Sequence, residues 1–306
     1  MVSIIVWFIL TISMKDNFVI LWVQLFRQCL NKVGECPRIK LIRPRLNNSI
    51  KCWHYRRMRI QYCSDLHLEF RENKNFLKLN PLKPNGDILL LAGDIVPFAV
   101  MHKHSDFFDY VGDHFETTYW VPGNHEYYQS DIADRSGRLN EKIRGNVFLV
   151  NNLAITHSDI KLIFSTLWAR ISPANQWPIQ QSISDFQVIF QNGHPFTPSH
   201  FNQLNEESLR FLQKEVSHDK SIVVTHHVPT FFQYPEQYKG DVLNEAFAIE
   251  LHDFIESSGI EFWLFGHHHQ NIPDFKIGTT KMITNQLGYV KYKEHAGFDI
   301  GKIIEI

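Results

Sequence analysis

Five short apolar runs in residues 58–306 predict buried strands. They cover residues 60–63, 88–92, 119–121, 222–224 and 262–265. Runs this short are too brief for helices, and their β-branched and aromatic content, bounded by glycine or proline, is typical of strands covered on both faces. Each run ends abruptly in polar residues. Further strands are predicted at 154–156, 162–165, 281–284 and 302–306.

Three segments between these strands place apolar residues at a spacing of three to four, which indicates amphipathic helices. They are residues 106–115, 202–216 and 244–255. The alternation of strands and helices predicts an α/β layered domain. Because open α/β sheets bind their ligands outside the carboxyl ends of the strands, we expect the polar residues after the five runs to meet at one edge.

Residues 1–57 differ from the rest of the chain in charge. They contain 10 of the 31 Lys and Arg and 2 of the 32 Asp and Glu, which leaves 21 basic and 30 acidic residues in 58–306. The net charges of the two segments are therefore +8 and −9. An acidic body argues against broad electrostatic binding to nucleic acid, which needs a basic face.

Residues 1–57, which we call the leader, show no clear pattern of strands or helices. Its apolar runs, 2–12 and 18–26, are each shorter than the roughly 18–20 residues that span a bilayer, and a signal peptide would carry a basic stretch before the first run. Met58 opens the first predicted strand. We therefore expect translation to start at Met58 and the leader to be no part of the fold. The alternative is a genuine membrane-associated leader.

The composition is that of a globular protein, with 44% hydrophobic and 21% charged residues among 306. If Met58 is the first residue, Cys63 is the one cysteine left and no signal precedes the domain. That predicts a disulfide-free cytoplasmic protein, whereas a genuine leader would make it membrane-associated.

The polar residues at the five strand ends are histidines, aspartates and an asparagine. In chain order, these ends read Asp65-Leu-His67, Gly93-Asp94, Gly123-Asn124-His125-Glu126, His226-His227 and Gly266-His267-His268-His269. Imidazoles and carboxylates without thiolates suit a pair of divalent metals. In an extended chain alternate side chains share a side, which groups Asp65 with His67 and His267 with His269 and points His268 away.

This ordered set, D-x-H, G-D, G-N-H-E, H and G-H-x-H, resembles the signature of the calcineurin-like metallophosphoesterases over roughly residues 58–290. The resemblance implies an α/β fold over 58–306: a β-sandwich flanked by helices on both faces, in four layers α-β-β-α. It also implies a binuclear metal centre at one edge. The intervals of 29 residues from Asp65 to Asp94, 30 to Asn124, 102 to His226 and 41 to His267 fit that family.

Carried over by position, the resemblance assigns seven metal ligands and one further catalytic residue. The ligands would be Asp65, His67 and His269 for one metal, Asn124, His226 and His267 for the other, and Asp94 as the bridge between them. His125 would stabilise charge on the phosphate or protonate the leaving group. His226 is preferred to His227 because it follows its strand at the usual distance. The metals implied are two divalent ions, Mn, Fe or Zn.

The activity that the resemblance implies is metal-dependent hydrolysis of a small-molecule phosphate ester, with a metal-bridging hydroxide attacking phosphorus. Residues 95–98, Ile-Val-Pro-Phe, lack the acidic and arginine residues that follow Gly-Asp in serine/threonine protein phosphatases. This departure argues against a protein phosphatase and for a small phosphate ester, of which a phosphodiester is slightly preferred. The alternatives are a phosphomonoesterase, including a protein phosphatase-like one, and a non-catalytic scaffold, against which the filled ligand positions argue.

Other residues near the predicted strand ends allow two interpretations. Trp168 and Arg170 could wall the substrate pocket, with Arg170 gripping phosphate, or could be an aromatic packed on the sheet edge and a solvated arginine. Glu126 could be a charge at a helix N-terminus or a hydrogen-bond partner behind the ligands. Residues 285–289 resemble a late loop of some family members near the active edge.

Overall fold

The computed structural model describes residues 14–15, 18–19, 57–157, 159–217 and 220–306. The hypotheses about the leader and the start of translation fall on residues 1–57, nearly all outside the described ranges, and stay predictions. Two short strands there, β1 (Met14–Lys15) and β2 (Phe18–Val19), pair antiparallel. All other elements belong to the compact unit Tyr55–Ile306. Within the described ranges, no helix combines the length and the apolar character needed to cross a membrane.

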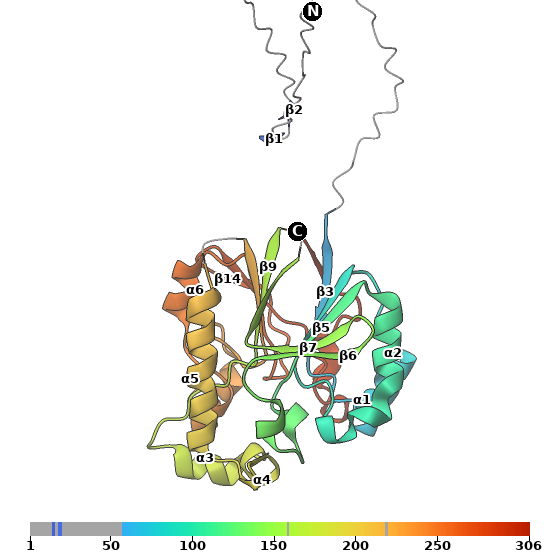
Figure 1. Cartoon of the computed structure of the whole chain (residues 1–306). Helices are drawn as coiled ribbons and strands as arrows, with labels where there is room; N and C mark the ends of the chain where they lie inside the picture. Colours follow the sequence, from blue (N-terminus) through green and yellow to red (C-terminus); the bar gives the residue numbers. More distant parts are fainter. Residues whose placement is uncertain (1–13, 16–17, 20–56, 158, 218–219) are drawn as a thin grey trace, which may run out of the picture. The chain divides into compact units, whose positions relative to one another are not determined.

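Two six-stranded sheets form the centre of this unit (Figure 1). In the first sheet the order is β16-β3-β4-β5-β7-β6, and the four inner strands run parallel while β16 and β6 pair antiparallel at the edges. Its strands are β3 (Arg59–Cys63), β4 (Ile88–Ala92), β5 (Thr117–Val121), β6 (Leu139–Arg144), β7 (Val147–Asn151) and β16 (Ile303–Glu305).

The second sheet repeats this plan. Its order is β14-β15-β13-β12-β9-β8, with four parallel inner strands and antiparallel edge strands β14 and β8. Its strands are β8 (Leu153–His157), β9 (Ile160–Ser165), β12 (Ser221–Thr225), β13 (Phe262–Leu264), β14 (Phe275–Ile277) and β15 (Thr280–Ile283). In both sheets, therefore, the inner strands end at the same edge.

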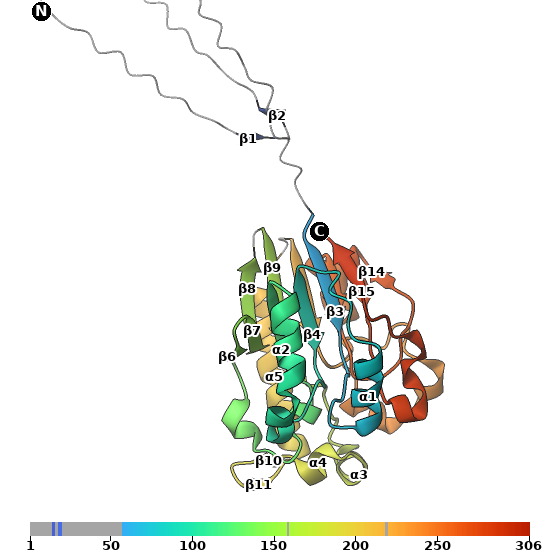
Figure 2. The same cartoon turned by 90° about the vertical axis from the view of Figure 1, so that its right-hand side faces the viewer.

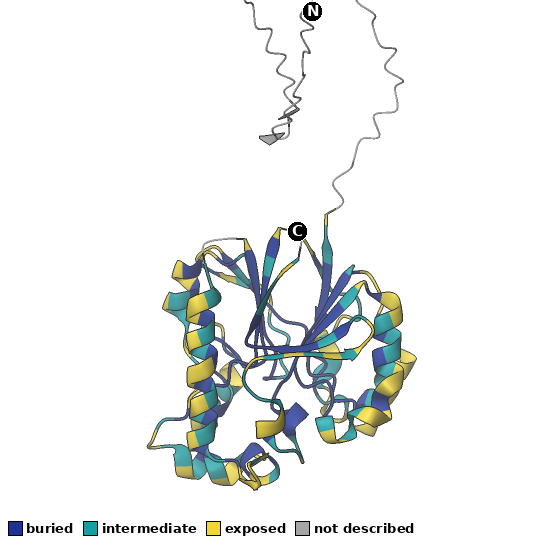
Figure 3. Ribbon diagram, viewed as in Figure 1, coloured by how far each residue is buried: buried dark blue, intermediate teal, exposed yellow. Residues whose placement is uncertain are grey.

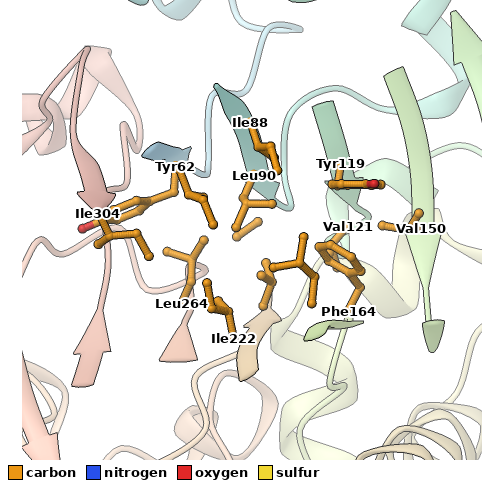
Figure 4. Close-up of a cluster of buried hydrophobic side chains, with 14 of the residues drawn as sticks. Tyr62, Ile88, Leu90, Tyr119, Val121, Val150, Phe164, Ile222, Leu264 and Ile304 are labelled. Carbon is orange, nitrogen blue, oxygen red and sulfur yellow. The ribbon is translucent and has the colours of Figure 1, made fainter. Parts of the chain in front are cut away.

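Alternation along the strands builds one core between the sheets and another on each outer face. In β4, Ile88 and Leu90 point into the layer between the sheets, where they meet Phe164 and Ile222 of the opposite sheet (Figure 4). Leu89 of the same strand points outward into the cluster beneath the helices. Both faces of β4 are buried, which explains why its sequence is a continuous apolar run.

Helices cover the outer face of each sheet (Figures 1 and 2). Over the first sheet lie α1 (Arg71–Leu79) and α2 (Ser105–His114), and over the second lie α5 (Pro198–Glu215) and α6 (His252–Ser258). Figure 3 shows these helices exposed on their outward sides and buried toward the sheets. The predicted four-layer α-β-β-α arrangement is confirmed.

Short elements fill the connections. They are α3 (Gln176–Ser182), α4 (Asp185–Val188), β10 (Phe190–Gln191), β11 (His194–Pro195), and the 3₁₀ turns η1 (Phe98–His104), η2 (His125–Tyr127), η3 (Ile132–Arg135), η4 (Glu236–Tyr238), η5 (Val242–Ala246), η6 (Val290–Tyr292) and η7 (Glu294–Gly297). The helices α3 and α4 lie below the sheets in Figure 1, at the end where the inner strands stop.

The predicted strands coincide with observed strands to within two residues, and the helices predicted at 106–115 and 202–216 appear as α2 and α5. The helix predicted at 244–255 is wrong. The backbone there pairs with residue 228 instead: the N–H of Val228 donates to Phe247 O over 3.2 Å, and the N–H of Ile249 donates to Val228 O over 3.0 Å. Tertiary pairing has overridden the apolar periodicity, so only η5 and α6 form.

Candidate metal centre

The loops that leave β3, β4, β12 and β13 bring six of the predicted ligands together. The ligand atoms of Asp65, His67, Asp94 and His269 all lie within 4.8 Å of one another, and so do those of Asp94, His226 and His267. Asp94 belongs to both groups. We call them the first group and the second group below.

The Asp94 carboxylate faces both groups with different oxygens. Its Oδ2 lies 3.7 Å from His67 Nε2, and its Oδ1 lies 3.4 Å from His226 Nε2. In the first group, Asp65 Oδ1 is 3.4 Å from His269 Nε2. With one oxygen toward each group, this carboxylate is placed where it can bridge two ions.

The histidines of these groups are oriented from behind. His226 Nδ1 lies 2.9 Å from the carbonyl oxygen of Ala92, and His67 Nδ1 lies 3.1 Å from Glu69 Oε1. His269 Nδ1 lies 2.8 Å from a carboxylate oxygen of Glu294. Because these partners only accept, each ring donates from Nδ1, which leaves its Nε2 free to bind a metal from inside the site.

Asn124 joins the second group through its amide oxygen. Its Nδ2 donates to Asp185 Oδ1 over 2.8 Å, and its Oδ1 then lies 3.2 Å from His226 Nε2. Asp185 is buried in α4, in the long connection between β9 and β12. The seventh predicted ligand is thus held in a metal-binding orientation by a carboxylate that is distant in sequence.

Five of the seven predicted ligands have a left-handed backbone. The φ angles are 56° at Asp65, 46° at His67, 55° at Asp94, 78° at His267 and 52° at His269. Such values are uncommon outside glycine, and strain of this kind clusters at functional sites. The extended chain assumed for the D-x-H and H-x-H pairs is therefore wrong. Tight turns, not alternation along a strand, aim these side chains into the site.

Two glycines let the ligand loops approach one another. A Cβ on Gly123 would collide with the Asp94 carboxylate and the ring of His226, and one on Gly93 would collide with the same ring. Gly93 also has a φ of 89°. The glycines of the G-D and G-N-H-E motifs are thus required by close packing around Asp94.

His125 lies beside the two groups, with its side chain nearly buried. Its Nδ1 is 3.2 Å from Glu69 Oε1, and its Nε2 is 3.3 Å from the hydroxyl of Tyr289. The ring of Tyr128 stacks on it at 4.0 Å. Burial lowers the pKa of His125, but the carboxylates of Asp94 and Glu69 outweigh burial and raise it. The carboxylates therefore favour the protonated form of this ring.

Carboxylate charge dominates the electrostatics of the site. Burial alone would lower the pKa of His226, yet Asp94 outweighs it and raises that pKa to about 9. Burial likewise opposes the hydrogen bonds of His269 to Asp65 and Glu294, which raise its pKa to about 10. A field that attracts protons this strongly also attracts divalent cations, and the two compete for Nε2.

The donor set fits two divalent cations. His67 Nε2 and His269 Nε2 lie 3.0 Å apart, as do His226 Nε2 and His267 Nδ1, and each pair faces an acidic oxygen. Imidazole nitrogens with carboxylate and amide oxygens suit Mn, Fe or Zn, and no thiolate lies among them. One ion in each group, with Asp94 shared and Asn124 added to the second group, would use all seven predicted ligands.

The neighbouring histidines of the motifs belong to neither group. His227 packs against Trp168 at 5.2 Å, and burial lowers its pKa to about 3. His268 accepts from Gln286 Nε2 over 2.8 Å, and burial lowers its pKa to about 4. Both stay neutral core residues.

Trp168 and Arg170 do not line the site. Trp168 is buried among Phe196 and Phe201. Arg170 has a side chain that is 55% exposed and lies 3.6 Å from a carboxylate oxygen of Glu206. The structure therefore matches the packed tryptophan and solvated arginine, not the phosphate grip.

Glu126 lies behind the ligands, and its carboxylate accepts several hydrogen bonds. Its carboxylate accepts from the backbone N–H groups of Asp94 over 2.9 Å, Ile95 over 2.7 Å and Gly123 over 2.6 Å, and from Trp120 Nε1 over 3.0 Å. It ties the G-D loop to the G-N-H-E loop, so the motif glutamate fixes where Asp94 stands.

Sequence reasoning missed three carboxylates that position the site: Glu69, Asp185 and Glu294. Glu69 had a signal, since it continues the D-x-H spacing by two residues. Asp185 and Glu294 carry no such signal in the sequence, because the tertiary fold alone brings them to Asn124 and His269.

A cavity of about 530 Å³ opens over both groups. Its lining includes Asp94, Asn124, His125, His267 and His269, and we call this side of the cavity its floor. It is the space in which a substrate could reach the predicted ligands and His125 together.

Comparisons with known proteins show which family and fold the chain resembles. The family model described as calcineurin-like phosphoesterase matches residues 58–271. An uncharacterized protein of Acanthamoeba polyphaga mimivirus is 31% identical over 277 residues, which is 80% of this chain and 98% of that protein. The crystal structure of phosphopantetheinyl hydrolase from Mycobacterium tuberculosis has a TM-score of 0.58 and 13% identity over 81% of this chain and 95% of that chain, which shows a shared fold.

Proposed function

Because the chain belongs to the calcineurin-like phosphoesterase family and is a phosphoric ester hydrolase, we propose that it hydrolyses a small phosphodiester at a binuclear metal centre. One observation carries the binuclear part of the proposal: Asp94 presents one oxygen to each ligand group, and its Oδ1 also accepts the backbone N–H of His125 over 2.9 Å. The Asp94 carboxylate therefore contacts both ligand groups and also holds the backbone of His125, the proposed proton donor.

The ligands we propose are Asp65, His67 and His269 for one ion, Asn124, His226 and His267 for the other, and Asp94 for both. When bound, two divalent ions would acidify a water molecule for attack on phosphorus and offset the charge on the phosphoryl oxygens. We propose Mn, Fe or Zn for these positions, on the chemistry of the donors.

His125 is the proposed general acid. Glu69 accepts its Nδ1–H, which orients the ring. The carboxylates of Asp94 and Glu69 raise the pKa of His125 and so favour the imidazolium, in which Nε2 also carries a proton. Nε2 can then donate to the leaving oxygen of the ester as the bond to phosphorus breaks. Tyr128 stacks on the ring and is itself held by Asp185 over 2.8 Å, so the imidazole has little freedom to turn away.

The test compares hydrolysis of bis-p-nitrophenyl phosphate and p-nitrophenyl phosphate by the full chain loaded with Mn²⁺, with Asp94→Ala as the control. We expect faster turnover of the diester, lost in the variant. Faster turnover of the monoester would favour the phosphomonoesterase alternative. No turnover of either ester by folded, metal-loaded protein would contradict catalysis and favour the scaffold.

We also propose that the protein acts in the cytoplasm as a product that begins at Met58. The support is the charge contrast between residues 1–57 and 58–306 and the strand that Met58 precedes. Mass spectrometry of the cellular protein tests it, and peptides from residues 1–57 would contradict it.

A further inference from the structure

The wall of the cavity above the ligands is apolar and aromatic. After β12 the chain contributes Tyr234 and Tyr238, η5 and the residue after it contribute Leu243 and Phe247, and the turn between α3 and α4 contributes Ile183. The ring of Phe247 stacks on that of His267 at 4.7 Å. The apolar wall thus begins at a predicted metal ligand, while Ser182, Ser184 and Asn244 add uncharged polar groups to the same lining.

No lysine or arginine lines this cavity, as far as the described ranges extend. Four carboxylates do: Asp94, Asp185, Asp241 and Glu294. Asp94 belongs to the ligand groups, and Asp185 and Glu294 are bonded to Asn124 and His269. Asp241, in contrast, is exposed, and its carboxylate accepts the backbone N–H of Leu243 over 2.9 Å.

These two observations limit what the cavity can hold. A substrate's phosphoryl group finds its countercharge at the ligand groups on the floor. A second anionic group would instead meet aromatic rings and the carboxylate of Asp241, where its lost hydration is not replaced. An uncharged ring or alkyl group would bury its surface against the wall.

We propose that the cavity selects phosphodiesters with a single negative charge and an apolar or aromatic ester group. The selection acts on binding of that group to the wall formed by Tyr238, Leu243 and Phe247. This inference rests on the proposed function and adds the class of substrate to it.

Two matched pairs of substrates test the inference in the metal-loaded full chain. The first pair is p-nitrophenyl phenyl phosphate against p-nitrophenyl methyl phosphate, which share charge and leaving group and differ in apolar surface. The second pair is thymidine 5′-(p-nitrophenyl phosphate) against the same ester with an added 3′-phosphate. Hydrophobic pockets discriminate by about 10–200-fold per methylene group lost. We expect kcat/KM at least about tenfold higher for phenyl than for methyl, and a similar loss on adding the 3′-phosphate.

Variants of the wall show whether this surface is the cause. Tyr238→Ala is expected to raise KM for the phenyl ester by at least about tenfold more than KM for the methyl ester. Tyr292→Ala, at an exposed tyrosine outside the cavity lining, is the matched control. Leu243→Lys is expected to recover turnover of the 3′-phosphorylated ester, whereas Leu79→Lys, at an exposed leucine in α1, is expected to change nothing.

The outcomes separate this inference from the proposed function. Turnover of all four esters with equal kcat/KM, or a 3′-phosphate that accelerates turnover of the wild-type protein, would overturn the inference alone. No turnover of any ester by folded, metal-loaded protein would overturn the proposed function and the inference with it. A phenyl preference that survives Tyr238→Ala and Leu243→Lys would assign the selectivity elsewhere and overturn the role of the wall.

Discussion

The floor of the cavity consists of buried ligand loops at strand ends, while its wall consists of aromatic and aliphatic side chains from two long connections. Floor residues such as Asp94 and His226 are held by several hydrogen bonds each, and Glu126 ties their loops together. Wall residues such as Tyr238 and Leu243 are half-buried in short 3₁₀ turns. Under the proposals above, the floor fixes the chemistry, and the half-buried wall residues Tyr238 and Leu243 set the choice of substrate.

The largest effect is expected at the residue that joins the two ligand groups. Asp94→Asn keeps the size of the side chain but removes the charge that faces both groups. Metal ions contribute several kcal/mol of charge stabilisation to such reactions, so we expect kcat/KM to fall by at least about 10³-fold. Steady-state hydrolysis of bis-p-nitrophenyl phosphate measures it. A fall of less than tenfold would contradict the proposed bridging role of Asp94.

His125→Gln is expected to be the next most damaging change, with kcat lower by about 10²-fold or more. Because His125 touches the leaving oxygen and not the ions in this account, metal content should stay at the wild-type level. The loss should also be greater for an alkyl leaving group, which needs the proton, than for p-nitrophenolate. An equal loss for both leaving groups, or a loss of metal, would contradict its role as the acid.

Glu69→Gln tests a group that supports both the proposed ligand His67 and the proposed acid His125, since Glu69 Oε1 accepts from both. Mutating such supporting groups costs about 10–100-fold in metal affinity or activity. Glu69 raises the pKa of His125, so its neutralisation should lower that pKa. The acid form would then be lost at lower pH, and the alkaline limb of the kcat/KM profile should move to lower pH. An unmoved limb would contradict the coupling.

The smallest expected effect concerns stability and pH. The raised pKa values of His226, about 9, and His269, about 10, lie above the usual value of about 6.5. In EDTA-treated protein their protonation stabilises the fold fully below about pH 6.5, and this stability is lost as the pH rises through about 9 to 10. Metal and proton compete, so affinity for Mn²⁺ should rise over the same window. Melting curves between pH 6 and 10 with EDTA, and Mn²⁺ titrations, measure both. A Tm of the EDTA-treated protein that rises with pH would contradict the prediction.

The sequence predicts the floor well because each of its motifs ends a short buried strand. The run at 88–92 predicts β4, and β4 ends one residue before Gly93-Asp94. Once parallel strands share an edge, the residues behind them converge, so local pattern suffices to gather the ligands. Their orientation was not predictable in the same way, because the left-handed turns at Asp65 and His267 go with a contact between separate loops: the His267 N–H donates to Asp65 Oδ1 over 3.1 Å.

The wall escaped prediction because its form depends on contacts between distant segments. Apolar spacing at 244–255 predicted a helix, but pairing with Val228 places Phe247 against His267 instead. Asp185 lies in a four-residue helix, too short to give a periodic signal, yet it orients Asn124. In the same region, Arg170 drew attention through its residue type alone, and the fold places it outside the cavity.

The central claim is that Asp94 joins two metal sites into one catalytic floor. Metal analysis of the full chain by mass spectrometry, combined with its turnover of bis-p-nitrophenyl phosphate, tests the claim most directly. The account predicts that activity rises with loading up to two ions per chain and that Asp94→Asn loses both full loading and turnover. Full activity with one ion per chain, or two ions and wild-type turnover in Asp94→Asn, would contradict it.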